Sequence, residues 1–209
     1  MKAITPGMRQ ATLLILLALC VPGALLPACT PAATTPPTPA EDEQRALESA
    51  VYAALFEAIY GTPRMYVLSE NTSPGLEGVD GLEGAVMTIL PGLADLEQAT
   101  LASFGERNQS ADPLAADMDL GLPYVLLSSA EYDEIFAINT SSWDVFYTRF
   151  PNSPGLTTVS HVGFNEDWSQ ALVYVGTLSN WKSGSGMYVL LEHASGTWQV
   201  VEQVLAWIS

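Results

Sequence analysis

Residues 156–209 constrain the fold of this chain most strongly. They contain four runs rich in Val, Leu, Tyr and Trp, which read LTTVSHVGF, QALVYVGTLS, MYVLLEH and TWQVVEQVLAWIS. Such runs are typical of β-strands, and the short polar turns between them favour antiparallel neighbours. The run ALVYV at 171–175 is apolar at both alternating sets of positions, which indicates a central strand covered on both faces. The sequence therefore predicts a four-stranded antiparallel meander.

A helix is predicted over residues 40–60. Residues 38–41 have the pattern of a capping box with Pro39 at the first helical position, and Gly61 with Pro63 ends the periodicity. The apolar residues recur at helical spacing, at Leu47, Val51, Ala54, Leu55, Ala58 and Ile59. We expect this helix to cover one face of the central strand.

Shorter elements fill the middle of the chain. Residues 64–69 and 124–128 are predicted strands, and 85–104 show a weaker helical pattern interrupted by Pro91. Capping boxes at Ser128 and Ser141 predict two short helices, the first through Phe136 and the second ended by Pro151. The predicted fold class is α+β: an antiparallel β-sheet, containing the C-terminal meander, packed against an N-terminal helix and further short helices.

The first residues resemble an export signal. Lys2 and Arg9 precede an almost wholly apolar run at 11–26, which is short for a membrane span. The run ends in Leu26-Pro27-Ala28-Cys29, which resembles the lipobox of bacterial lipoproteins. That resemblance implies cleavage before Cys29 and a lipid on its side chain. The alternative is an ordinary secretory signal cut nearby.

A spacer follows Cys29. Residues 30–39 read TPAATTPPTP, without a charge, which is typical of an extended tether rather than a folded element. The predicted organisation is a lipoprotein signal peptide at 1–28, a lipid-anchored tether at 29–39 and a single domain at 40–209. The predicted location is the bacterial cell envelope, outside the cytoplasm, with the membrane as a partner through the lipid on Cys29.

Charge and cysteine content exclude several function classes. The chain has 23 acidic and seven basic side chains, and removal of Lys2 and Arg9 with the signal leaves a formal charge of −18. So few cations argue against nucleic acid or anionic lipid headgroups as partners. The acidity favours solubility, with adaptation to salt or contact with cations as alternatives. Because both cysteines lie within the first thirty residues, the domain has no disulfide and no cysteine-ligated metal.

Reactive groups are few, so no catalytic residue, metal ligand or cofactor is predicted. The two histidines are His161 and His193, and neighbours in a strand such as Ser160 and His161 point to opposite faces. No nucleophile elbow, zinc-protease motif or phosphate loop occurs. We therefore favour a non-catalytic binding or structural envelope module. A cell-envelope hydrolase using paired carboxylates is one alternative. A small-ligand-binding domain of cystatin-like or nuclear-transport-factor-like shape is another.

The C-terminal half resembles a recurring module of uncharacterised bacterial envelope proteins. The resemblance covers roughly residues 120–209 and rests on Ser160-x-Val162-Gly163-Phe164, Ala171-Leu172-Val173-Tyr174-Val175, Gly184-x-Gly186-x-Tyr188-Val189-Leu190-Leu191, Trp198-x-Val200 and Trp207-Ile208-Ser209. It implies a fold and a location but no activity.

Candidate contact residues lie in the predicted connections of this meander. They are Trp168, Trp181 and the adjacent Lys182, which suit another envelope protein or a carbohydrate as partner. The alternative is that the two indoles fold back over the core.

Overall fold

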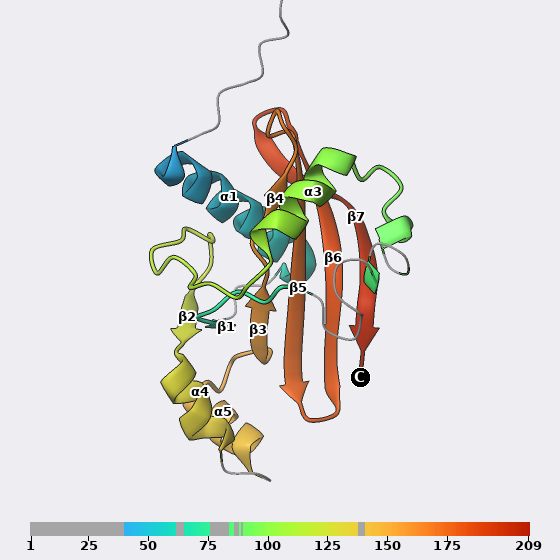
Figure 1. The fold of residues 1–209 in the computed structure, drawn as a ribbon. Coiled ribbons are helices and arrows are strands. Elements are labelled where there is room, and N and C mark those ends of the chain that lie inside the picture. Colours follow the sequence, from blue (N-terminus) through green and yellow to red (C-terminus); the bar gives the residue numbers. More distant parts are fainter. Residues whose placement is uncertain (1–39, 62–64, 76–83, 86–87, 89, 138–140) are drawn as a thin grey trace, which may run out of the picture. The chain divides into compact units, whose positions relative to one another are not determined.

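A mixed sheet of seven strands forms the centre of the fold (Figure 1). The computed structural model describes residues 40–61, 65–75, 84–85, 88, 90–137 and 141–209, which belong to one compact unit, Thr35–Ser209. The strand order is β2-β1-β3-β5-β6-β7, with β4 paired to β5. The strands are β1 (Tyr66–Ser69), β2 (Tyr124–Leu127), β3 (Leu156–Val159), β4 (Gly163–Phe164), β5 (Gln170–Asn180), β6 (Ser183–Ala194) and β7 (Thr197–Ile208).

The antiparallel meander is confirmed, but the sheet as a whole is not purely antiparallel. Strands β3, β5, β6 and β7 pair antiparallel in chain order, whereas β1 runs parallel to both β2 and β3. Local alternation cannot predict this parallel pairing, because it joins strands that are far apart in the chain. The first strand of the meander is also interrupted, since Ser160, His161 and Val162 separate β3 from β4.

Helix α1 (Glu41–Tyr60) covers one face of the meander, as expected (Figure 1). Its buried residues share a core with the inward side chains of β5 and β6, and they are Glu48, Val51, Tyr52, Leu55 and Phe56. The predicted cap is wrong. The N-cap is Ala40, and the Glu43 carboxylate accepts its N–H at 3.2 Å. The buried stripe also differs from the predicted one, because it includes Glu48.

The opposite face of β5 and β6 is covered by η1 (Leu90–Gly92) and α3 (Gln98–Arg107). Phe104 packs there with Tyr188 at 5.9 Å between ring centroids, and Leu172 and Leu190 complete this second core. The central strand is therefore covered on both faces, as its apolar pattern predicts. The weak helical pattern at 85–104 resolves into η1 at Pro91 and a separate helix six residues further on.

Helices α4 (Ser129–Phe136) and α5 (Ser142–Arg149) pack on β1, β2 and β3, around Ile135, Phe146 and Phe150. The capping box at α4 is confirmed, because Ser128 Oγ accepts the Glu131 N–H and Glu131 accepts the Ser128 N–H. At α5 the capping prediction is wrong, because Ser141 is the N-cap but its side chain makes no capping hydrogen bond.

Candidate functional site

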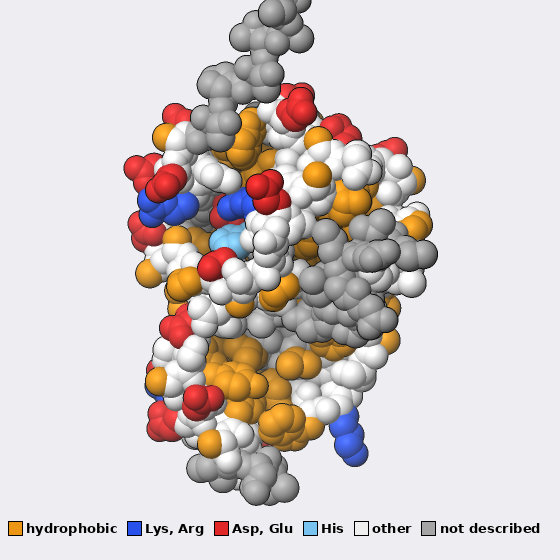
Figure 2. Space-filling view, in the orientation of Figure 1, with side chains coloured by type: hydrophobic (Ala, Val, Ile, Leu, Met, Phe, Trp, Pro, Cys, Tyr) orange, Lys and Arg blue, Asp and Glu red, His pale blue; other side chains and the backbone are white. Residues whose placement is uncertain are grey.

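A partly exposed aromatic surface lies where β5 turns into β6, beside α4 and α5. We call it the Trp181 face, and its residues are Tyr132, Phe136, Tyr147, Leu178 and Trp181, with the buried Trp143 beneath them. Figure 2 shows hydrophobic side chains gathered at this end of the sheet.

A register shift near the end of β5 determines the position of Trp181. The pairing of β5 with β6 shifts register between Leu178 and Asn180, and the Tyr147 hydroxyl donates to the carbonyl of Ser179 at 2.8 Å. The Asn180 side chain then accepts the Lys182 N–H at 2.8 Å, which closes the turn. A bulge of this kind re-aims a side chain. Here it brings the turn against α5.

The Trp181 indole is exposed and yet held in place. Its ring centroid lies 5.9 Å from that of Phe136 and 6.2 Å from that of Trp143, with interplanar angles of 83° and 80°. Edge-to-face contacts of this kind are favourable arrangements of aromatic rings. Even so, 59% of Trp181 is exposed, beside Tyr132 at 43% and Leu178 at 42%. The face is therefore a pre-formed apolar surface open to solvent.

The helices under this face carry negative charge. Of their four acidic residues, Glu131 and Glu134 pair with Arg149, whereas no ion pair reaches Asp133 or Asp144 within the described part of the chain. Hydrogen bonds from Ser128 lower the pKa of Glu131. The Trp181 face is therefore bordered by carboxylates, two of which have no ion-pair partner in the described ranges.

A hollow of about 300 Å³ adjoins Tyr132. Leu127 and Leu156 give it an apolar lining, and Asp133, Ser69 and Ser129 supply polar groups. The Glu70 carboxylate accepts both the N–H and the hydroxyl of Ser129, at 2.6 and 2.7 Å. These two bonds lower the pKa of Glu70. A second carboxylate therefore lies close to this hollow.

The two predicted contact tryptophans are not brought together. Trp168 precedes β5 and Trp181 follows it, so roughly 35 Å of strand separates them. Trp168 is half-buried and packs on Phe164 with 5.0 Å between centroids, so it closes over the core. Trp181 and Lys182 are exposed. Cys29, the predicted lipidation site, lies outside the described residues.

The most deeply buried charged cluster among the described residues was not predicted from the sequence. Its centre is Glu48 on α1, whose side chain is 11% exposed. Its carboxylate accepts the Val162 N–H at 2.8 Å and lies 3.1 Å from His161 Nδ1 and 3.4 Å from an Arg107 nitrogen. Burial acts to raise the pKa of Glu48. The hydrogen bond with His161, the Arg107 charge and the Val162 N–H outweigh it and hold that pKa below its usual value.

This cluster holds the break between β3 and β4. The Tyr52 hydroxyl donates to the carbonyl of Ser160 at 2.7 Å, and Arg107 donates to the carbonyl of Val162. The Asn108 side chain accepts the His161 N–H at 2.8 Å and donates to the His161 carbonyl at 3.0 Å. Side chains from α1 and from the end of α3 therefore supply the bonds that a strand partner supplies elsewhere.

In the described part of the chain, the ring nitrogens of His161 face two carboxylates, and the first belongs to Glu48. Its other ring nitrogen lies 3.8 Å from an Asp112 carboxylate oxygen. The Ser160 hydroxyl donates to the His161 carbonyl and accepts the Tyr174 N–H. Both of its partners are therefore backbone groups. The second histidine, His193, is exposed and lies against Trp198 at 5.1 Å between ring centroids.

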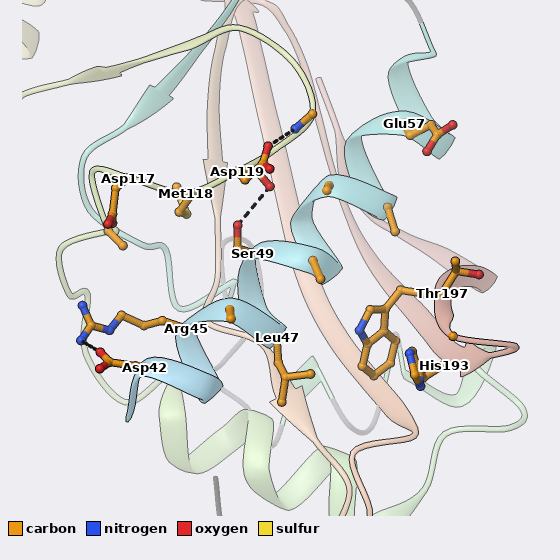
Figure 3. A pocket seen from close by; sticks show the side chains of 18 residues that line it. Asp42, Arg45, Leu47, Ser49, Glu57, Asp117, Met118, Asp119, His193 and Thr197 are labelled. Atoms are coloured by element: carbon orange, nitrogen blue, oxygen red, sulfur yellow. Dashed lines mark hydrogen bonds and ion pairs between the residues drawn. The ribbon is translucent and has the colours of Figure 1, made fainter. Parts of the chain in front are cut away.

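A larger hollow, of about 850 Å³, lies between α1, the segment 115–121 and the end of the sheet where β6 turns into β7, where His193, Thr197 and Trp198 line it (Figure 3). Arg45 there pairs with Asp42 at 2.6 Å, and the Ser49 hydroxyl donates to the carbonyl of Asp119 at 3.1 Å. Core side chains pack between α1 and the sheet, and Trp198, at the edge of this core, also lines the hollow.

Neither a metal centre nor a membrane span is found in the described part of the chain. Among the residues that the structure describes, no three His, Cys, Asp or Glu side chains gather to hold a metal ion. None of the helices in the described ranges combines the length and apolar character that a membrane span requires.

No protein-family model, curated protein or solved structure matches this chain. The two resemblances inferred from the sequence therefore stay predictions.

The sequence indicated Trp181 through its place in a predicted turn. It did not indicate that the rings of Phe136 on α4 and Trp143 on α5 pack against this indole and make it part of a larger face. It also missed Glu48. A signal was available, because Glu48 lies three, four and seven residues before Val51, Tyr52 and Leu55, which is the spacing of one helix face.

Proposed function

We propose that this chain is a lipid-anchored, extracytoplasmic protein of the bacterial cell envelope whose domain is a non-catalytic binding module. The observation that carries the binding role is the pre-formed Trp181 face. An indole clamped by two rings and still 59% exposed has the character of an interface anchor.

The buried charged cluster supports the non-catalytic part of the proposal. Glu48, Arg107 and Tyr52 bond to the backbone of the β3–β4 break, so their polar atoms serve the fold. The larger hollow lies over α1, away from this cluster. Among the described residues, none of Glu48, Arg107 and Tyr52 lines either of the two hollows.

The predicted anchor supports the envelope location. A lipid on Cys29 followed by ten residues of Pro-, Thr- and Ala-rich tether would hold the domain roughly 30 Å from the membrane. The first described helix starts at Glu41, directly after that tether.

The anchor is tested by detergent partition of the full chain made in a bacterial host. The wild type is expected in the detergent phase with a diacylated Cys29 at its N-terminus, shown by mass spectrometry. Cys29→Ala is expected to lose the lipid, whereas the control Cys20→Ala keeps it. Wild-type protein in the aqueous phase with another N-terminal residue contradicts the anchor.

The non-catalytic role is tested on the purified domain with panels of esters, glycans and peptides. No turnover is expected. Turnover that disappears in a folded His161→Gln, His193→Ala double variant contradicts the role. Glutamine is chosen for the first position because its side-chain amide can still donate a hydrogen bond to Glu48 and preserve the fold.

A further inference from the structure

We propose that the Trp181 face docks a cationic segment of another protein, with an apolar residue against Trp181, a second one in the hollow beside Tyr132, and Lys or Arg next to Asp133. This inference rests on the proposed binding function and specifies its partner.

The apolar part of the argument comes from the exposed rings. Trp181, Tyr132 and Leu178 are each more than two-fifths exposed. Trp181 and Tyr132 both contact Phe136, which in turn packs on the buried Trp143. Protein interfaces have such a centre: aromatic anchors that are pre-ordered, surrounded by apolar contacts that exclude water. A sugar needs hydrogen-bonding side chains around its stacking ring. The described neighbours that contact the Trp181 ring are instead Phe136 and Trp143.

The hollow next to Tyr132 adds a place for a second side chain. Leu127, Leu156 and Tyr132 supply apolar surface, and its volume of about 300 Å³ accommodates a large aliphatic or aromatic group. Asp133 lines the same hollow. An apolar side chain that enters the hollow therefore meets apolar surface, and a Lys or Arg next to it in the partner can pair with the Asp133 carboxylate.

The negative charge of this domain indicates that the partner segment is positively charged. Asp133 and Asp144 have no ion-pair partner in the described ranges, and Glu70 lies close to the hollow with a lowered pKa. Residues 30–209 carry a formal charge of −18, which attracts a cationic segment and repels an acidic one.

The same count argues against a second copy as the occupant. The domain has five basic residues, and three of them, Arg45, Arg107 and Arg149, pair with carboxylates of their own chain. Lys182 belongs to the turn that carries Trp181 itself. A second acidic domain therefore has little positive charge to offer.

The first experiment uses the full-length, lipidated chain in the cells that produce it. A photo-crosslinking phenylalanine analogue replaces Tyr132, and the same analogue at Leu205, an exposed residue of β7, serves as the control. Mass spectrometry of the crosslinked peptides is expected to identify, at position 132 only, a protein segment with apolar residues flanked by Lys or Arg.

The second experiment measures binding of that segment as a synthetic peptide to the wild-type chain and its variants. Trp181→Ala is expected to weaken binding at least tenfold, about the effect of losing an interface anchor. Asp133→Lys, which keeps every ring, is expected to weaken it about fivefold and to reduce its dependence on salt. Leu205→Ala is expected to change nothing.

Several outcomes overturn this inference. They are capture of an acidic segment, a glycan or a second copy at position 132, equal capture at position 205, no capture at all, and a peptide whose affinity does not depend on Trp181. A glycan at position 132 overturns the inference but leaves the proposed binding function intact. Turnover by the purified domain contradicts the proposed function independently.

Discussion

The indole Nε1 of Trp207 donates a hydrogen bond to the hydroxyl of Tyr174 over 2.8 Å. The bond links the end of β7 to the centre of β5 across Gly186 of β6. A Cβ at position 186 would lie 2.5 Å from the Tyr174 hydroxyl and would also overlap Trp207 Nε1. The absence of a side chain at Gly186 therefore makes room for this bond.

Gly186→Ala is expected to destabilise the domain by about 1–3 kcal/mol, the usual cost of overpacking a filled site. The measurement is the free energy of unfolding in urea. Ser185→Ala is the control, because the neighbouring side chain points to the other face of β6 and is expected to change stability by less than about 0.5 kcal/mol. Equal stability of Gly186→Ala and wild type would show that the Trp207–Tyr174 contact is loose.

Trp198 and Trp181 offer a comparison of one residue type in two settings. Trp198 is 8% exposed and belongs to the core that α1 shares with the sheet, whereas Val200, two residues further along β7, is only half-buried. Trp198→Ala is expected to cost roughly 3–5 kcal/mol. Trp181→Ala, on the exposed face, is expected to cost less than about 1 kcal/mol. Similar melting temperatures for the two variants would contradict these placements.

Glu48→Ala is expected to destabilise the domain by about 3 kcal/mol. It removes the acceptor for the Val162 N–H and leaves Arg107 and His161 without their buried partner. Glu57→Ala, which removes an exposed acid further along the same helix, is the matched control with little expected effect. Chemical denaturation of both variants at neutral pH measures the difference. Equal losses would mean that Glu48 contributes only its helical propensity.

The stabilisation from the ionised Glu48 is expected to depend on pH. Its pKa in the folded protein lies below the usual value of 4.5, so folding favours the ionised form. This contribution is complete above that value and disappears as the pH falls through the lower, folded-state pKa. The difference in unfolding free energy between wild type and Glu48→Gln is therefore expected to be constant above about pH 6 and to shrink toward about pH 3. A difference that grows on acidification would contradict the sign.

The strands of the meander could be predicted because their pattern is local. ALVYV in β5 is apolar on both faces, and the turns around it contain Asn, Asp and Gly. The parallel pairing of β1 with β2 could not be predicted, because Tyr66 meets Tyr124 across 58 residues and no local pattern records that choice. The cap of α4 was predictable for the same local reason, since Ser128 and Glu131 contact each other three residues apart.

The candidate site shows the same division. Trp181 could be placed in a turn from its neighbours in the chain. That its ring rests on Phe136 and Trp143 depends on how α4 and α5 meet the sheet, which the sequence pattern does not encode. Glu48 was hidden for another reason: near the start of an acidic helix, a carboxylate has the usual character of a solvated surface group.

The break between β3 and β4 has a consequence for folding kinetics. Its backbone groups bond to Glu48, Tyr52, Arg107 and Asn108, across sequence separations that reach 114 residues. The loop-closure entropy of such distant contacts makes them slow to form. The β-hairpins of β5, β6 and β7 can form from neighbouring segments, but the break can be protected only once α1 and α3 have docked. Hydrogen-exchange protection of the Val162 amide should therefore appear together with that of both helices and after that of the β6–β7 hairpin.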